Sequence, residues 1–339
     1  MPYQLVHNGL LREFRLYMPI GWPYWVERAF SEDGRNGLPL VIALHGGAED
    51  PENFSDDWPL HTLINSPSNA NWEDRFFVLY PHGFAATTLA NEPVRGWNTG
   101  FAGEVPPAQN DVGFIRQAVA AVEEMLRAEL AQLGIAHAPI DADRRFLFGY
   151  SMGGMMAYKL AHDVPDHFAA MWVMSGAYGG RSHEGLTPTI TNDPQGSFGL
   201  SLFAHHGEAD VVVPPGPRND QTGRTTSTFN RALYIAAGLQ AADADAYAGS
   251  FRTLHAAVEE FKLYNDCEPR AASSSTVEAD IGGGNGALKF VFQRTGNPAN
   301  PEVVVYRDPA MAHTGFTASP NRYFDAADVW DWFKLHPRV

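Results

Sequence analysis

Ser151 lies between two glycines, directly after an apolar run of residues. The run Arg145–Gly149 is typical of a buried strand, and Gly153–His162 has the pattern of a helix. In a Gly-x-Ser-x-Gly sequence of this kind, the abrupt turn from strand to helix exposes the serine hydroxyl. The free N–H groups of the helix N-terminus point toward that hydroxyl. The sequence therefore predicts that Ser151 is a nucleophile.

A serine hydroxyl needs a base to take its proton, and that base is usually a histidine oriented by a carboxylate. After a strand–serine–helix turn, the acid and then the histidine follow along the chain, each in a loop after a later strand. Asp210 follows the apolar run Leu200–His205, and His313 follows Val303–Arg307. We therefore predict that Asp210 is the acid and His313 is the base.

Two other carboxylates compete with Asp210 for the role of the acid. Glu208 lies in the same predicted loop, and Asp308 follows directly after the last predicted strand. We favour Asp210 because it lies within the turn and not beside the end of a strand. His205 and His206 end the strand before Asp210, and we interpret both as structural histidines.

A carbonyl group attacked by a serine develops negative charge on its oxygen, and two backbone N–H groups commonly stabilise that charge. One donor is the residue after the nucleophile, which is Met152. The second donor comes from a loop after an early strand, where this chain has a His-Gly-Gly-Ala sequence whose glycines allow close approach of the substrate. We predict the N–H of Gly47, with Gly46 and Ala48 as alternatives, and we expect His45 to brace the loop.

Short apolar runs alternate with helical patterns along the chain, which predicts a mostly parallel central sheet flanked by helices. An antiparallel hairpin that turns at Asn8-Gly9 precedes this alternation. We expect one α/β domain over residues 1–339, because no linker divides the chain. The other predicted strands are Leu38–Leu44, Phe76–Tyr80, Arg145–Gly149, Ala169–Met174, Leu200–His205 and Val303–Arg307, and the predicted helices are Val112–Leu133, Gly153–His162, Ser250–Tyr264 and Ala326–Leu335.

Three stretches of the chain fit this alternation poorly. Residues 175–198 are rich in Gly, Pro, Thr and Asn, residues 214–248 run from prolines to an alanine-rich segment that favours a helix, and residues 270–287 contain triplets of serine and glycine. Long insertions after strands often act as lids or binding loops, and plain surface loops are the alternative. We predict lid-like insertions at residues 175–198 and 214–248.

The composition limits the classes of partner. The formal net charge of −15 over 339 residues disfavours nucleic acid, because phosphate binding needs clustered Lys and Arg. No apolar run is long enough to span a bilayer, so we do not expect a membrane as a partner either. A single cysteine, Cys267, excludes an intramolecular disulfide. The N-terminus lacks the pattern of a signal peptide, which predicts a cytoplasmic protein, although a trimmed secreted form would look the same.

Seven motifs occur in the order seen in the polyhydroxybutyrate depolymerase-like esterases. That group also includes the feruloyl and acetylxylan esterases of carbohydrate esterase family 1. The resemblance extends from about Arg12 to Leu335, nearly the whole chain. The motifs are Leu44-His45-Gly46-Gly47, Tyr80-Pro81-His82-Gly83, Gly96-Trp97-Asn98, Asp111-Val112-Gly113-Phe114-Ile115, Gly149–Gly154, His206-Gly207-Glu208-Ala209-Asp210 and Ala312-His313-Thr314.

The resemblance implies an α/β-hydrolase fold with a Ser–Asp–His triad at Ser151, Asp210 and His313. It also implies an oxyanion donor at Gly47, and neither a metal nor a cofactor is implied. In this group the tryptophan of the Trp-Asn motif lines the acyl- or polymer-binding side of the cleft, which would place Trp97 there. The residue itself leaves a second interpretation open, in which Trp97 covers the core.

The chain departs from the pattern of the group at three loops. Glycines 47 and 96 stand where the group often has cysteines, so no disulfide ties those loops together. Gly315 and Phe316 stand where the group usually has Trp-Pro after its His-Thr pair, which changes the expected shape of the substrate cleft.

These observations together predict a serine ester hydrolase that forms an acyl-enzyme. Its expected substrates are small or oligomeric esters of feruloyl, short-acyl or hydroxyalkanoate type. A serine peptidase of the prolyl-oligopeptidase kind shares the serine turn and the order of the triad, and it is the alternative. A binding protein on the same scaffold would lack a member of the triad, whereas this chain has all three. The oligomeric state is not predicted.

Overall fold

The computed structural model describes residues 2–49, 51–66, 71–87, 93–99, 110–178, 199–216, 224–227, 241, 251–265, 267, 276–279, 287–293, 301–313 and 324–338. Its strands are β1 Tyr3–His7, β2 Leu10–Tyr17, β3 Leu38–Leu44, β4 Phe77–Pro81, β5 Phe84–Thr87, β6 Pro93–Gly96, β7 Ile140–Tyr150, β8 Ala170–Met174, β9 Ser201–Gly207, β10 Arg224–Thr225, β11 Phe251–Arg252, β12 Thr276–Ala279, β13 Leu288–Gln293 and β14 Glu302–Asp308. Its helices are α1 Trp22–Asp33, α2 Pro51–Asp57, α3 Leu60–Leu63, η1 Trp72–Asp74, α4 Asp111–Gln132, α5 Met152–Asp163, η2 Pro165–His167, α8 Leu254–Tyr264 and α10 Ala326–Lys334.

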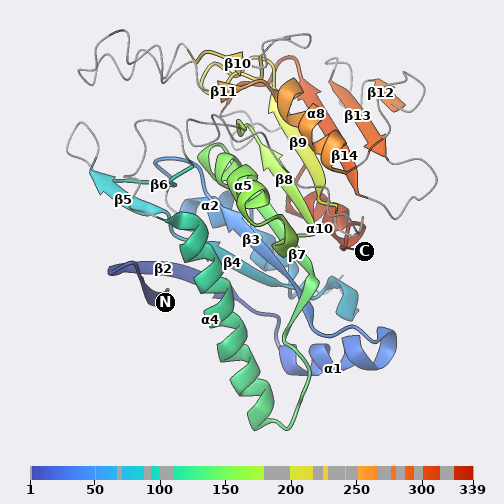
Figure 1. Ribbon diagram of the computed structural model, residues 1–339. Coiled ribbons are helices and arrows are strands. Elements are labelled where there is room, and N and C mark those ends of the chain that lie inside the picture. Colours follow the sequence, from blue (N-terminus) through green and yellow to red (C-terminus); the bar gives the residue numbers. More distant parts are fainter. Residues whose placement is uncertain are drawn as a thin grey trace.

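A ten-stranded sheet forms the centre of the molecule, in the order β1-β2-β4-β3-β7-β8-β9-β14-β13-β12 (Figure 1). The strands from β4 to β14 in this order run parallel, and the strands on either side of them pair antiparallel. Parallel strands are buried on both faces, which explains why their sequences read as continuous apolar runs. The predicted mostly parallel α/β sheet with flanking helices is confirmed, and the architecture is that of the α/β-hydrolase fold.

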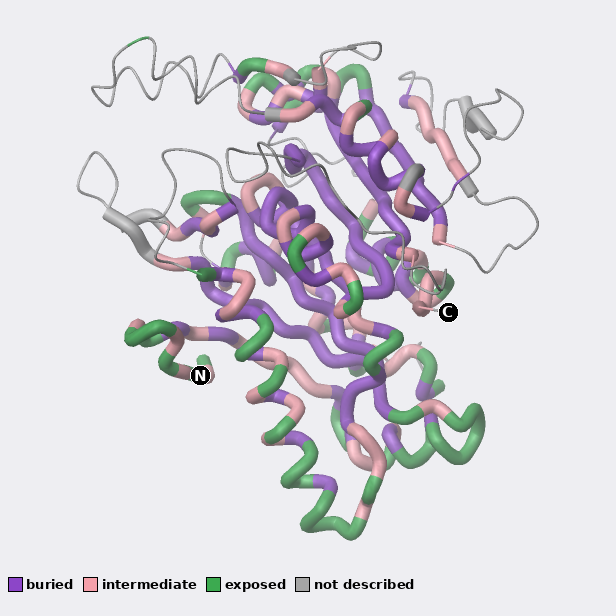
Figure 2. Tube along the Cα trace, viewed as in Figure 1, coloured by how far each residue is buried: buried purple, intermediate pink, exposed green. Residues whose placement is uncertain are grey.

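Two hydrophobic clusters fill the space between the sheet and its helices. One cluster joins alternate residues of β3 to helices α1, α4, α5 and α8, and the other joins the intervening residues to α2, α3 and α10. Figure 2 shows the central strands buried along their length, whereas the outer side of α4 is exposed. On the second face, Trp330 of α10 stacks on Phe76 with 3.8 Å between ring centroids. The sheet is therefore covered on both faces, as a parallel sheet requires.

The N-terminal hairpin turns at the residues that the sequence predicts. Asn8 and Gly9 both have positive φ, at 50° and 78°, as the two central residues of a type I′ turn require. Strand β1 pairs with β2 from Tyr3 opposite Phe14 to His7 opposite Leu10. Strand β2 then pairs with β4, so the hairpin extends one edge of the sheet.

The structure differs from the sequence prediction in several elements outside the central strands. Helix α8 begins at Leu254 and not at Ser250, because residues 251–252 pair with β10 and the Thr253 side chain accepts a hydrogen bond from the N–H of Ala256. Strands β12 and β13 form an antiparallel extension that the sequence analysis did not predict. Residues 179–198, 217–223, 228–240 and 242–250, which make up most of the predicted lid-like insertions, lie outside the described residues.

The carboxyl ends of the parallel strands meet at one edge of the sheet, so the loops after β3, β7, β9 and β14 lie close together. These four loops carry the predicted oxyanion glycine, Ser151, Asp210 and His313. Among the described helices, none has the length and apolar character needed to cross a membrane.

Candidate functional site

Ser151 occupies a strained turn between β7 and α5. Its φ of 53° and ψ of −118° are unfavourable for a residue with a side chain. The N–H of Ser151 donates to the carbonyl oxygen of Met174 at 2.8 Å, which fixes the turn against the neighbouring strand β8. The turn presents Oγ at the carboxyl edge of the sheet and at the N-terminus of α5.

Glycines on either side of Ser151 make this turn possible. A Cβ atom on Gly153 would lie 2.0 Å from the carbonyl oxygen of Leu44, and one on Gly149 would lie 2.4 Å from the carbonyl oxygen of Gly153. Both neighbours are backbone atoms, which cannot move aside as a flexible side chain can. The glycines of the Gly-x-Ser-x-Gly sequence therefore allow α5 to pack directly against the end of β3.

Replacing Gly153 with alanine is expected to lower the free energy of unfolding by about 3 kcal/mol, because the new methyl group overlaps backbone. A Gly134→Ala variant is the matched control. A Cβ on Gly134 would have no atom within 4 Å, unlike one on Gly153, but Gly134 has a φ of 75°, so its substitution should cost about 1 kcal/mol from backbone strain alone. Urea denaturation of both variants measures the difference, and equal losses would contradict the packing argument.

The structure brings Ser151, His313 and Asp210 into one chain of hydrogen bonds. Ser151 Oγ lies 2.8 Å from His313 Nε2, and His313 Nδ1 lies 2.7 Å from Asp210 Oδ2. A carboxylate only accepts hydrogen bonds, so Nδ1 carries the ring proton and Nε2 is left to accept the proton of the serine hydroxyl. This is the protonation state in which a histidine can act as a base toward a serine.

Asp210 is 3% exposed, and its carboxylate is held by several donors. Oδ1 accepts the N–H groups of Val212 and Val213 at 2.9 and 2.8 Å. Burial alone would raise the pKa of Asp210, but hydrogen bonds with His206 and His313 outweigh burial and hold the pKa below its usual range. Asp210 is therefore ionised at neutral pH, as a residue that orients a histidine must be.

The two competing carboxylates have other partners. Glu208 Oε1 lies 3.0 Å from Nε of Arg307, and Asp308 Oδ1 accepts the N–H of Ala310 at 2.9 Å. Of the three carboxylates, Asp210 is the one that the structure places against His313.

His205 and His206 lie on opposite faces of β9 and are both buried. Burial lowers the pKa of His205 to about 3, so this ring is neutral where it packs edge-on against Tyr306. His206 Nε2 lies 2.6 Å from the carbonyl oxygen of Val213 and 3.4 Å from Asp210 Oδ2. His205 therefore packs in the core, as predicted, whereas His206 also contacts the carboxylate of Asp210.

The loop after β3 leaves one of its three candidate N–H groups available. The N–H of Gly46 donates to Glu49 Oε2 at 2.6 Å, and the N–H of Ala48 donates to the carbonyl oxygen of Arg95 at 2.8 Å. Within the described part of the chain, no hydrogen bond engages the N–H of Gly47. The N–H of Met152 belongs to the first residue of α5, where no intrahelical acceptor exists. A Cβ on Gly47 would lie 3.2 Å from Met152 Cε, so the two residues are neighbours.

His45 braces this loop, as the sequence analysis expects. Its Nδ1 lies 2.7 Å from the carbonyl oxygen of Gly46, and its Nε2 accepts the N–H of Gly83 at 2.9 Å. Each ring nitrogen is thus engaged by backbone, which fixes the tautomer and leaves the ring no role in proton transfer to a substrate.

Trp97 has no exposed surface. Its indole N–H donates to the carbonyl oxygen of His45 at 2.9 Å, and its backbone N–H contacts Met152 Sδ at 3.3 Å. The structure places Trp97 in the core beneath the loop after β3, which is the second of the two positions that the sequence left open. Its contacts support the loop and do not form an exposed wall of a cleft.

A buried ion pair fixes the segment that carries Trp97. Arg12 Nη2 lies 2.6 Å from Asp111 Oδ1, and Asp111 Oδ2 accepts the N–H of Asn98 at 2.6 Å. The Arg12 guanidinium also lies over the ring of Phe114, 3.9 Å from its centroid. Asp111 and the Trp-Asn motif, which are separate in the sequence, therefore form one support for the loop after β3.

Glu49 is a part of the site that the sequence analysis missed. Burial raises the pKa of Glu49 to about 7, although the hydrogen bond from Gly46 opposes this shift, and the nearby charge of Asp57 adds to it. Because the pKa is higher in the folded chain than its ordinary value of 4.5, the folded chain binds more protons between these two pH values. The contribution of Glu49 to stability is therefore complete below pH 4.5 and is lost as the pH rises through 7.

A Glu49→Gln variant is expected to remove this pH dependence, because the amide oxygen can still accept the N–H of Gly46 but cannot ionise. Near pH 5 the two proteins should be similar in stability. Near pH 8 the variant should be more stable by about 1 to 2 kcal/mol, a value reduced for partial exposure to solvent. Urea denaturation across this range checks the prediction, and a difference that does not change with pH would contradict it.

A sequence model of the phospholipase/carboxylesterase family matches residues 34–232, which is more than half of the 339-residue chain. The chain belongs to this family. The matched region contains the loop after β3, Ser151 and Asp210, and it ends before His313. Among the described residues, no group of three or more His, Cys, Asp or Glu side chains is placed to hold a metal ion.

Two curated relatives of this carboxylesterase-family protein have names that describe ester hydrolases. It is 28% identical over 238 residues to NocK of Nocardia uniformis subsp. tsuyamanensis, whose name describes an esterase; the match covers 68% of this chain and 59% of NocK. It is 26% identical over 181 residues to the poly(3-hydroxyoctanoate) depolymerase of Pseudomonas fluorescens, with coverage of 52% and 58%. The chain thus spans less than two thirds of the length of either relative.

A solved structure extends the likeness to the whole chain. The acetyl xylan esterase from Aspergillus awamori has a TM-score of 0.51 and 14% sequence identity, with 99% of each chain covered. At this identity the likeness shows the shared fold. The resemblance to this group of α/β-hydrolase esterases is confirmed.

One contact to the loop that carries His313 could not be predicted from the sequence. The hydroxyl of Tyr150 donates to the carbonyl oxygen of His313 at 2.7 Å. The two residues are far apart in the chain, and the position before the serine in Gly-x-Ser-x-Gly accepts any residue type. The contact depends on β7 and the loop after β14 ending at the same edge of the sheet.

Proposed function

We propose that this protein is a serine carboxylic-ester hydrolase that works through an acyl-enzyme. Ser151 is the nucleophile, His313 is the base and Asp210 is the acid. The observation that carries the proposal is the chain of hydrogen bonds from Ser151 Oγ through both nitrogens of His313 to Asp210, at 2.8 and 2.7 Å. Membership of the phospholipase/carboxylesterase family supports ester bonds as the bonds that are cleaved.

The first half of the reaction transfers the acyl group to Ser151. His313 Nε2 takes the hydroxyl proton as Oγ attacks the ester carbonyl carbon, and Asp210 stabilises the imidazolium. The carbonyl oxygen becomes an oxyanion, which accepts hydrogen bonds from the N–H groups of Gly47 and Met152. When the bond to the alkoxy oxygen breaks, His313 returns the proton to the leaving alcohol.

The second half of the reaction releases the acid. Water attacks the carbonyl carbon of the acyl-enzyme, and His313 takes a proton from that water. The same two N–H groups hold the second oxyanion. The bond to Ser151 Oγ then breaks, and His313 returns the proton to the serine. The ester and one water are thereby converted into an acid and an alcohol.

We propose an apolar or aromatic acyl group in the substrate, of feruloyl, short-acyl or hydroxyalkanoate type. Met155, Ala177 and Val213 form a small apolar cluster of their own beside the site, with Val212 packed against it. Met155 lies one helical turn after Ser151, since its N–H donates to the carbonyl oxygen of Ser151. The three clustered side chains are buried and Val212 beside them is partly exposed, so the environment next to Ser151 is apolar and includes a flexible thioether, which suits an apolar acyl group. The name of the poly(3-hydroxyoctanoate) depolymerase supports the hydroxyalkanoate class.

An activity panel tests the proposal. It contains p-nitrophenyl esters from acetate to octanoate, methyl ferulate and hydroxybutyrate oligomers. Where a corresponding amide can be made, that amide is included beside its ester. We expect kcat/KM to be measurable for at least one ester class and lower for its amide. A fluorophosphonate probe should add its mass to the peptide that contains Ser151. Labelling of a different serine, or faster cleavage of amides than of esters, would contradict the proposal.

A further inference from the structure

Arg307 contacts both ends of the loop that carries Asp210. Its Nε lies 3.0 Å from Glu208 Oε1, and its Nη2 donates to the carbonyl oxygen of Gly216 at 3.1 Å. Residues 208–216 form the segment between these two contacts, and Asp210 lies within it. Arg307 is itself 6% exposed, so its guanidinium is held away from bulk solvent.

The position of Arg307 in the fold connects this loop to the base. Arg307 is on β14, opposite His206 of β9 in the parallel register, and the chain continues from β14 directly to His313. A side chain on β14 that holds the Asp210 loop therefore fixes the acid relative to the strand that leads to the base.

The loop formed by residues 208–216 has its own internal hydrogen bonds. These bonds shape the loop but do not determine its position relative to the sheet. The bonds from Val212 and Val213 to Asp210 shape the turn. Backbone bonds from Glu208 to Asp308 and from Ala209 to Met311 tie the beginning of the loop to the chain after β14. At the far end, His206 of β9 contacts the carbonyl oxygen of Val213, and the N–H of Leu254 on α8 donates to the carbonyl oxygen of Pro215. The contact from Arg307 to Gly216 is the tie from this end of the loop to β14.

We infer that Arg307 is a positioning residue, which holds the Asp210 loop against β14 so that the carboxylate stays in line with His313. The inference rests on the proposed function. A guanidinium is suited to this task because its nitrogens are fixed in one plane and can contact two acceptors at once. A lysine ammonium has no such fixed geometry and could replace only one of the two contacts. A small displacement of a catalytic group can cost about a hundredfold in rate.

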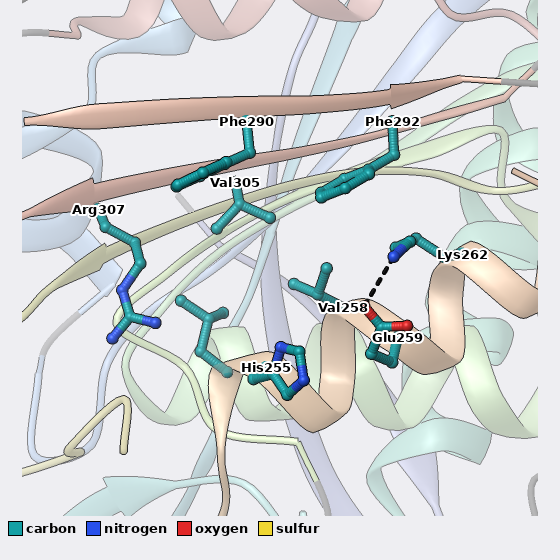
Figure 3. Close-up of a pocket in the computed structure, with 9 residues that line it drawn as sticks. His255, Val258, Glu259, Lys262, Phe290, Phe292, Val305 and Arg307 are labelled. Carbon is teal, nitrogen blue, oxygen red and sulfur yellow. Dashed lines mark hydrogen bonds and ion pairs between the residues drawn. The ribbon is translucent and has the colours of Figure 1, made fainter. Parts of the chain in front are cut away.

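A groove beside Arg307 provides a way to test the role of the guanidinium. The groove has a volume of about 320 Å³ and lies between α8 and strands β13 and β14. Figure 3 shows Arg307 at one end of it and Phe292 with Lys262 at the other. Shortening Arg307 would enlarge this space, so a small guanidinium ion from solution could occupy the position of the missing group.

The experiment compares Arg307→Ala and Arg307→Lys with the unmodified chain on an ester that the activity panel identifies. We expect Arg307→Ala to lower kcat by about 10-fold to 100-fold with KM changed by less than about twofold, because the loop positions the catalytic acid and not the substrate. Arg307→Lys should lose less. Methylguanidinium at low, non-denaturing concentration should restore part of the kcat of Arg307→Ala, and methylammonium should restore less.

Lys262→Met is the matched control, because it removes a buried cation from the same groove. Lys262 pairs with Glu259 at 2.7 Å, on α8, away from the Asp210 loop. We expect its kcat to stay within about twofold of the unmodified value. An equal loss in Lys262→Met and Arg307→Ala would overturn the inference, as would full kcat in folded Arg307→Ala.

The remaining outcomes are also decisive. If Arg307→Ala does not fold, as judged by its thermal unfolding, a loss of kcat in folded Arg307→Lys supports the inference and an unchanged kcat contradicts it. An unmodified chain that hydrolyses no ester in the panel counts against the proposed function. An active chain whose Arg307 variants keep their kcat counts against the role of Arg307 alone.

Discussion

Replacing Ser151 with alanine is expected to lower kcat for ester hydrolysis by about a million-fold, the loss typical of removing a nucleophile from a serine–histidine pair. The Ser151 hydroxyl forms the covalent intermediate. No other serine among the described residues is hydrogen-bonded to His313 Nε2. Binding of substrate should change little, because the oxyanion donors are backbone groups. Burst and steady-state kinetics with a p-nitrophenyl ester measure the loss.

Ser175→Ala is the control for this substitution. Ser175 follows directly after the neighbouring strand β8, has a similar positive φ of 45°, and is fully buried. Among the described residues its hydroxyl has no hydrogen-bond partner, so its removal should leave kcat within about twofold. Ser151→Ala that retains the activity of the unmodified chain would contradict the proposed mechanism, and a matching loss in Ser175→Ala would show that the loss is not specific to the hydroxyl bonded to His313.

The central part of the fold could be predicted because its signals are local. Apolar runs such as Leu38–Leu44 are continuous where a strand is buried on both faces, and α4 repeats its apolar residues at helical spacing over its whole length. Asn8-Gly9 specifies a tight turn by its own backbone preferences. None of these predictions needs a contact between distant parts of the chain.

Elements at the margins of the sheet were harder to predict because they depend on their neighbours. Strand β13 alternates Leu288, Phe290 and Phe292 with other residues, but the strand exists because β14 offers it an edge. Helix α8 begins later than its apolar pattern suggests, because residues 251–252 pair with β10 instead. Periodicity alone does not identify which of these competing pairings a segment makes.

In the candidate site, too, local sequence signals predicted some features, and others depend on contacts between distant residues. Chain order and loop position were sufficient to select Ser151, Asp210 and His313 from the sequence. The structure brings these three residues together. The sequence favoured Gly47 as the second oxyanion donor but left Gly46 and Ala48 open, because the N–H groups of these two neighbours are engaged by Glu49 and Arg95, which are contacts of the folded chain. The position of Trp97 was equally undecided, since burial is a property of the packed loop and not of the tryptophan.

Replacing Asp210 with asparagine is expected to lower kcat by about ten thousand-fold while the fold is kept. Asparagine has nearly the same shape, so Val212 and Val213 can still donate to its oxygen. Its amide group can also donate a proton toward His313 Nδ1, which favours the ring tautomer with the proton on Nε2. That tautomer cannot accept the proton of Ser151. The loss should therefore appear in kcat with little change in KM.

Glu208→Gln is the matched control for Asp210→Asn, since it makes the same change of carboxylate to amide two residues away in the same loop. Glu208 faces Arg307 and not His313, so we expect a loss of less than about tenfold, arising from a weaker hold on the loop. Kinetics of the two variants at pH 7 and pH 9 separate the possibilities. If Glu208→Gln lost more activity than Asp210→Asn, Glu208 would be the acid, and the hydrogen bond between Asp210 and His313 would then serve only to fix the loop. The large separation that we expect follows from one contact of 2.7 Å, because only the residue bonded to Nδ1 determines which nitrogen of His313 is free to accept the proton of Ser151.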